Sequence, residues 1–101
     1  MADSARSLER ACIALWSATL ALMTAYMHQG APAHRLLLAR RIAANFDTLA
    51  RQDTFAPASR AAFARLHGRW HGIADALARP APSEGGRGLL QRLLPLRQQD
   101  L

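Results

Sequence analysis

The sequence predicts an all-α protein, an up-down-up three-helix bundle followed by a flexible linker and a short leucine-rich C-terminal segment. Alanine, leucine and arginine make up 51 of the 101 residues, and these are among the strongest helix formers. There is no valine and there are only three isoleucines, so the residues that build strands are scarce. Three long segments with helical periodicity are joined by two short connections that contain proline, which is typical of antiparallel helix neighbours.

The first helix is expected from about Ser4 to His28, with Asp3 or Ser4 as its N-cap. Its large side chains share one side, and the opposite side is small and carries no charge after Arg10. A helix with two faces suited to packing is expected to be central, either inside the fold or inside an oligomer. The large-residue side consists of Leu8, Cys12, Leu15, Trp16, Thr19, Leu20, Leu22, Met23, Tyr26 and Met27.

Residues 11–27 form an uncharged run of 17 residues. This run is at the short limit for a membrane span, which usually needs about 20 apolar residues, and serine, threonine, tyrosine and alanine dilute it. We therefore expect a buried helix rather than a membrane span. A signal peptide is disfavoured by Asp3 and Glu9 in the segment before the run. Because a single cysteine, Cys12, cannot form an internal disulfide, the expected location is the cytoplasm.

The second helix is expected from about Ala33 to Gln52 and the third from about Pro57 to Ala78. Gly30 is a candidate C-cap for the first helix, and Pro32 and Pro57 suit the first turns of the next two. Asp47 and Arg51 are spaced as an i,i+4 ion pair. Apolar residues at spacings of three and four predict the buried stripes, which are Leu38, Ile42, Phe46 and Leu49 in the second helix and Phe63, Leu66, Trp70, Ile73 and Leu77 in the third.

The expected domain organisation is a bundle at residues 1–79, a linker at 80–88 and an amphipathic tail at 89–101. The linker is rich in proline and glycine, which do not sustain a helix. In the tail, Leu90, Leu93 and Leu94 alternate with arginines, a pattern typical of a segment that folds when it docks in a groove. The tail folding back on its own bundle is the alternative.

The function we expect is that of a small, basic, non-enzymatic accessory protein that acts by protein–protein interaction and self-association. No phosphate-binding loop, nucleophile motif or ordered catalytic triad is present. A three-helix bundle has one interior, so the alanine side of the first helix should stay in water and offer a contact surface for a protein partner or a homodimer. The predicted interface residues are Ala18, Ala21, Leu36, Leu37, Gly68, Gly72, Leu90, Leu93 and Leu94.

The alternative function is nucleic-acid binding. The formal net charge is +6, and an excess of arginine favours an anionic partner. Rows of arginine on the second and third helices are suited to contact phosphates without reading sequence. The candidate residues are Arg40, Arg41, Arg51, Arg65 and Arg69, and a membrane is the less favoured anionic surface.

We expect no cofactor and no bound metal. His67 and His71 at i,i+4, with Asp75 one turn later, are spaced like ligands on one side of a helix. No second motif completes a coordination shell, and both histidines lie at the edge of the predicted core stripe. They are therefore interpreted as boundary residues.

Overall fold

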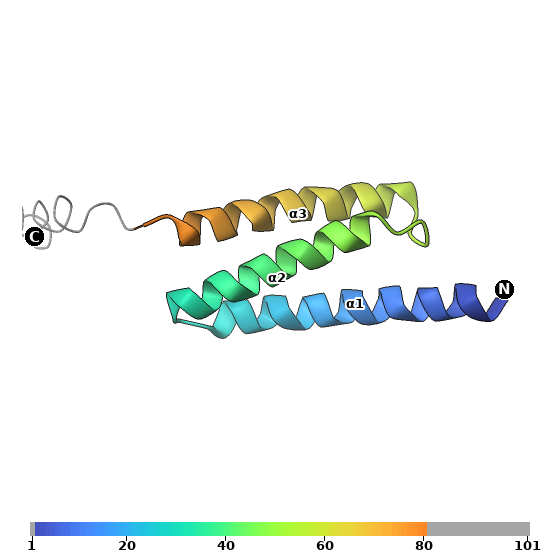
Figure 1. The fold of residues 1–101 in the computed structure, drawn as a ribbon, viewed down its shortest axis with the longest axis horizontal. Coiled ribbons are helices and arrows are strands. Elements are labelled where there is room, and N and C mark those ends of the chain that lie inside the picture. The colour runs from blue at the N-terminus through green and yellow to red at the C-terminus, as the bar shows by residue number, and fades with distance from the viewer. Residues whose placement is uncertain (1, 81–101) are drawn as a thin grey trace, which may run out of the picture.

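The computed structural model describes residues 2–80, which form three helices: α1 (Ala2–His28), α2 (Pro32–Ala50) and α3 (Pro57–Ala78). No strand occurs within this range, and the all-α prediction is confirmed. Consecutive helices run in opposite directions and pack side by side, which is compatible with the up-down-up bundle (Figure 1). The tail at 89–101 and nearly all of the linker lie outside the described residues.

Both connections begin the next helix with proline, as expected, but the first turn differs from the prediction. Pro32 and Pro57 occupy the first turns of α2 and α3, where a missing backbone N–H costs nothing. Gly30 has no positive φ, so the predicted glycine C-cap is wrong. The Gln29 side chain holds this turn instead, accepting a hydrogen bond from the backbone N–H of Ala31 at 3.0 Å.

The core lies mainly between α2 and α3. Aromatic rings fill its middle: the ring centroids of Phe46 and Phe63 lie 6.1 Å apart, and Phe55 from the turn packs edge-on against Phe63 at 5.0 Å. Both predicted stripes therefore face inward for most of their length. The buried side chains are Ala39, Ile42, Ala43, Phe46 and Leu49 from α2 and Phe63, Trp70 and Ala74 from α3.

Among its described side chains, α1 buries only Cys12 and Thr19. The Thr19 hydroxyl donates to the carbonyl of Leu15 at 2.7 Å, which satisfies this buried polar group. Two larger rings attach α1 to α3: Trp16 lies 5.2 Å from Phe63, and Tyr26 lies 5.0 Å from Trp70, between ring centroids. Further half-buried α1 residues that pack against the core are Leu15, Leu22 and Met23.

Three expectations about position are wrong. Within the chain the central helix is α2, which packs against both α1 and α3 (Figure 1), whereas α1 lies on the outside. The alternative place for α1, inside an oligomer, stays a prediction. Leu8, Leu20 and Met27, assigned to the packed side of α1, are 49%, 45% and 77% exposed. Leu36, expected in water, is half-buried against the core. The last two errors arise because residues at the border of an apolar stripe turn inward or outward according to where the neighbouring helix lies.

Candidate functional site

The most unusual surface of the molecule is a row of exposed residues along α1, which we call the α1 seam. Ile13, Leu20 and Met27 recur every seven residues and are 59%, 45% and 77% exposed. A seven-residue spacing keeps side chains on nearly the same side of a helix. Ser17 and Thr24 lie between them and are also exposed, so the row has the alternating four-and-three spacing of a helix-packing stripe.

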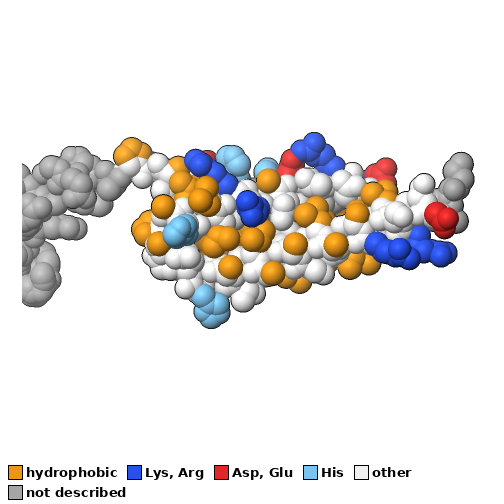
Figure 2. All heavy atoms as spheres, turned by 60° about the horizontal axis from the view of Figure 1, so that its bottom comes forward, with side chains coloured by type: hydrophobic (Ala, Val, Ile, Leu, Met, Phe, Trp, Pro, Cys, Tyr) orange, Lys and Arg blue, Asp and Glu red, His pale blue; other side chains and the backbone are white. Residues whose placement is uncertain are grey.

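The α1 seam lies in a stretch without any charge. In the view of Figure 2, hydrophobic side chains are spread along the molecule, and charged side chains appear at the right-hand end, along the upper edge and near the centre. The helix Asp3–His28 is long and apolar enough to cross a membrane by length and composition, and 11% of its most apolar 18-residue window is buried. The expectation that residues 11–27 form a buried helix is therefore wrong, because most residues of this run are not buried.

Ala18 and Ala21, the predicted contact residues of α1, are exposed as expected. Ala21 borders the α1 seam, and Ala18 lies farther round the helix. Leu37 of α2 is 62% exposed and helps to form a shallow hollow beside the C-terminal part of α1. This hollow is lined by Ala25, Gln29, His34, Leu37, Leu38 and Arg41.

The two predicted contact residues of α3 do not join this surface. Gly68 and Gly72 are exposed on α3, and a Cβ added to either would meet nothing within 4 Å. The fold itself therefore does not require glycine at these positions. Leu90, Leu93 and Leu94 lie outside the described residues.

The five candidate arginines are all exposed, but they are spread over several surfaces. Arg51 pairs with Asp47, as predicted from their spacing. Arg65 and Arg69 line a hollow on α3 together with Ala62 and Leu66. Arg41 lines the hollow beside α1, and Arg40 lines a groove between α2 and α3. Phe55, the aromatic residue of the second turn, is half-buried against Phe63 and is not free to stack on a base.

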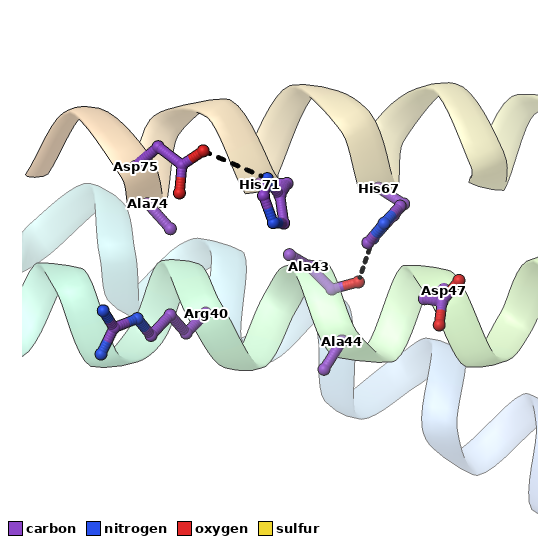
Figure 3. Close-up of a pocket in the computed structure, with 8 residues that line it drawn as sticks. All are labelled: Arg40, Ala43, Ala44, Asp47, His67, His71, Ala74 and Asp75. Carbon is purple, nitrogen blue, oxygen red and sulfur yellow. Dashed lines mark hydrogen bonds and ion pairs between the residues drawn. The ribbon is translucent and has the colours of Figure 1, made fainter. Parts of the chain in front are cut away.

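The groove between α2 and α3 brings the predicted polar residues together (Figure 3). Nδ1 of His67 lies 2.9 Å from the backbone carbonyl of Ala43, and Nδ1 of His71 lies 3.4 Å from a carboxylate oxygen of Asp75. The groove is lined by Arg40, Ala43, Ala44, Asp47, His67, His71, Ala74 and Asp75.

Asp47 lies at the edge of this groove, and the partner of its carboxylate is on the same helix, α2. The hydrogen bond from Arg51 lowers the pKa of Asp47 below its ordinary value because it outweighs desolvation, which raises this pKa, and the charge of Arg51 lowers it further. Within residues 2–80, no group of three or more histidine, cysteine, aspartate or glutamate side chains is placed to hold a metal ion.

The contact between His67 and Ala43 is the feature of this groove that sequence reasoning missed. It joins residues 24 positions apart, so no local spacing reports it. The only available signal was that His67 lies at the edge of the α3 core stripe, where a ring nitrogen can reach the neighbouring helix.

Comparison with protein-family models, curated proteins and solved structures finds no match for this chain.

Proposed function

We propose that the protein is a non-enzymatic helical module that acts by binding a second copy of itself through the α1 seam. The observation that supports this proposal is the exposure of Ile13, Leu20 and Met27 in an uncharged stretch. Exposed apolar rows of this kind usually mark contact sites, and a symmetric dimer buries the same row twice.

An antiparallel pairing of two α1 helices fits the order of residues in the seam. With Leu20 on the twofold axis, Ile13 of each copy faces Met27 of the other, and Ser17 faces Thr24. The seam from Ile13 to Met27 spans about 21 Å at 1.5 Å per residue. All five residues are exposed, so the contact requires no rearrangement of the core. The Thr24 hydroxyl already donates to the carbonyl of Leu20 at 3.1 Å, and it enters the contact without an unsatisfied donor.

Charge also fits this pairing. A basic chain repels its own copy, but no charged residue lies between Arg10 and His28. In the antiparallel arrangement Arg10 lies beside the C-terminal end of the other α1. The free carbonyls there carry partial negative charge, which favours a cation.

A membrane is the competing occupant of the same face. A spanning α1 must leave the bundle, because Trp16 and Tyr26 pack against rings of α3. Binding a second copy leaves these contacts in place. An uncharged surface suits a second copy of the chain and a membrane equally well, so the experiment must include vesicles.

The test is the molar mass of matched variants, measured by size-exclusion chromatography with light scattering. Leu20→Glu places two carboxylates on the proposed axis and should convert the dimer to a monomer, with unchanged helical content in circular dichroism. Ala21→Glu borders the seam and should weaken the dimer. Ala64→Glu makes a matched change on the exposed side of α3 and should leave the mass unchanged.

Three results contradict the proposal. One is equal mass for Leu20→Glu and the unmodified chain. Another is dissociation by Ala18→Arg but not by Leu20→Glu, which would move the interface to the alanine side of α1. The third is a monomer that co-floats with anionic phospholipid vesicles, which would assign the seam to a membrane.

The second candidate function is nucleic-acid binding, and the exposure of all five candidate arginines favours it. The charge lies on α2 and α3, so this activity does not compete with the α1 seam. The proposed linker and tail together contain three more arginines.

The tail at 89–101 is also the segment that we propose for binding a protein partner.

A further inference from the structure

We infer that His67 and His71 form a binding site for a single divalent ion of the zinc or nickel type. The two histidines are one turn apart on α3 and line the same groove (Figure 3). Histidines at i,i+4 on one side of a helix are a recurring ligand pair for such ions. This inference does not depend on the proposed self-association.

The hydrogen-bond partners of the two rings determine which nitrogens are available. The Ala43 carbonyl can only accept, so Nδ1 of His67 must carry the proton that it donates across 2.9 Å. The carboxylate of Asp75 likewise favours the proton on Nδ1 of His71. In the neutral rings both Nε2 atoms then have free lone pairs. Ligating histidines in proteins nearly always have their other ring nitrogen held by a carbonyl or a carboxylate in this way.

Nε2 of His67 is not completely buried. Among the described residues, Arg35 is the only one with a buried side-chain nitrogen or oxygen that has no hydrogen-bond partner. Nε2 of His67 makes no hydrogen bond either, so it keeps some contact with solvent. His71 is 62% exposed at its side chain, and its Nε2 is accessible with it.

The distance between the rings fits a shared ion after a small movement. A zinc–nitrogen bond of about 2.0–2.1 Å places each ring centroid about 3.2 Å from the ion, so a tetrahedral angle separates the centroids by about 5.2 Å. The observed separation is 5.8 Å. The centroids therefore lie within about half an ångström of the separation that a shared ion needs, and the exposed His71 ring must rotate so that its Nε2 faces the ion.

Water must supply the other coordination positions. Asp47 lines the groove but is held by Arg51, and no set of three protein ligands lies ready among residues 2–80. Arg40 also lines the groove, and its charge opposes a cation. These features predict a two-histidine site of modest affinity, selective for ions that prefer imidazole nitrogen over oxygen.

The experiment is a calorimetric titration of the full chain, without a histidine tag, with Zn²⁺ and separately with Ni²⁺ and Mg²⁺. We expect one Zn²⁺ or Ni²⁺ per chain and no measurable Mg²⁺ binding. His71→Ala should weaken binding at least tenfold. It removes an exposed side chain and should leave the fold intact. Asp75→Asn should weaken binding less, and Arg40→Gln should strengthen it severalfold.

The matched control is His34→Ala, which removes an exposed histidine in the hollow beside α1 and should leave the affinity unchanged. His67→Gln tests the second ligand, and its circular dichroism spectrum shows whether the loss of the Ala43 contact unfolds the hairpin. Unchanged affinity in His71→Ala, or a loss of binding in His34→Ala instead, would overturn the inference. Absence of any Zn²⁺ or Ni²⁺ binding to the unmodified chain would also overturn it.

Discussion

Helix α1 is more apolar than the α2–α3 hairpin, but fewer of its side chains are buried. The hairpin contributes eight buried apolar residues to the core, whereas α1 contributes Cys12 and the polar Thr19. In the hairpin, arginines and aspartates line the outside, so each helix has one apolar side. In α1 the outside carries no charge between Ala11 and Met27. The hairpin is therefore committed to one interior, and α1 keeps a second surface suited to contact.

This difference matters because burial, rather than helix propensity, provides most of the stability of helices in proteins. The rings of α1 still join it to the hairpin, through Trp16 on Phe63 and Tyr26 on Trp70. Arg35 of α2 adds a cation–π contact, with its guanidinium carbon 4.3 Å from the centre of the Tyr26 ring. One side of α1 is thus anchored, and the other side presents the α1 seam.

We expect the largest loss of stability when an aromatic side chain is removed from the hairpin. Trp70 is 8% exposed and contacts Tyr26 of α1, so Trp70→Ala should destabilise the fold by about 3–5 kcal/mol, the usual cost of such a truncation. Leu22→Ala in α1 removes a half-buried side chain and should cost less. Chemical denaturation measures the free energy of unfolding of both variants. Equal losses for the two would contradict the difference in packing between the hairpin and α1.

The sequence predicted the helices well because their signals are local. Pro32 and Pro57 mark helix starts, and the spacing of Phe63, Trp70 and Leu77 identifies the inward side of α3. Contacts between helices were less accessible. Leu20 and Met27 could be assigned to either side of α1, since no charged residue on the opposite side defines an outside. The contact of His67 with Ala43 depends on how closely α2 and α3 approach, and no local pattern encodes that distance.

Hydrogen exchange should reveal the same difference in local stability. Amides of α1 should exchange faster than those of α2 and α3, because few side chains hold α1 to the core. Raising the protein concentration should protect residues 13–27 selectively, since association stabilises the bound surface. Mass spectrometry of peptides after exchange measures the protection of the amides in each region. Protection of α1 equal to that of the hairpin at all concentrations would contradict the comparison.

Substitutions in the hairpin and in α1 should differ in their effect on nucleic-acid binding, because the charged side chains that would contact phosphates lie on the hairpin. If the hairpin binds nucleic acid, Arg40→Ala and Arg69→Ala should each weaken binding about equally for all sequences and reduce the salt slope by about one. Leu20→Glu, in α1, should leave the salt slope nearly unchanged for the monomeric chain. Fluorescence anisotropy at several salt concentrations measures both. No binding at about 50 mM salt, where phosphate contacts are strong, would exclude this function.

The smallest effect is expected for the exposed pair Asp47–Arg51. The Arg51 hydrogen bond lowers the pKa of Asp47, so the pair stabilises the fold at pH values above the ordinary carboxyl pKa. This contribution is lost as the pH falls through the lowered pKa of the folded state. Asp47→Asn should therefore cause only a slight loss of stability at neutral pH and none at low pH, measured by thermal melts. A large loss would show that the pair does more than close one turn of α2.

Sedimentation equilibrium of the unmodified chain, over micromolar concentrations, measures self-association through the α1 seam without any substitution. The chain mass is 11.0 kDa, and we expect a concentration-dependent shift from this value toward twice this value. Leu20→Glu should remain at the monomer mass over the same range. A monomeric mass at every concentration would contradict self-association. Protection of residues 89–101 from proteolysis would then indicate that the tail covers the bundle of its own chain.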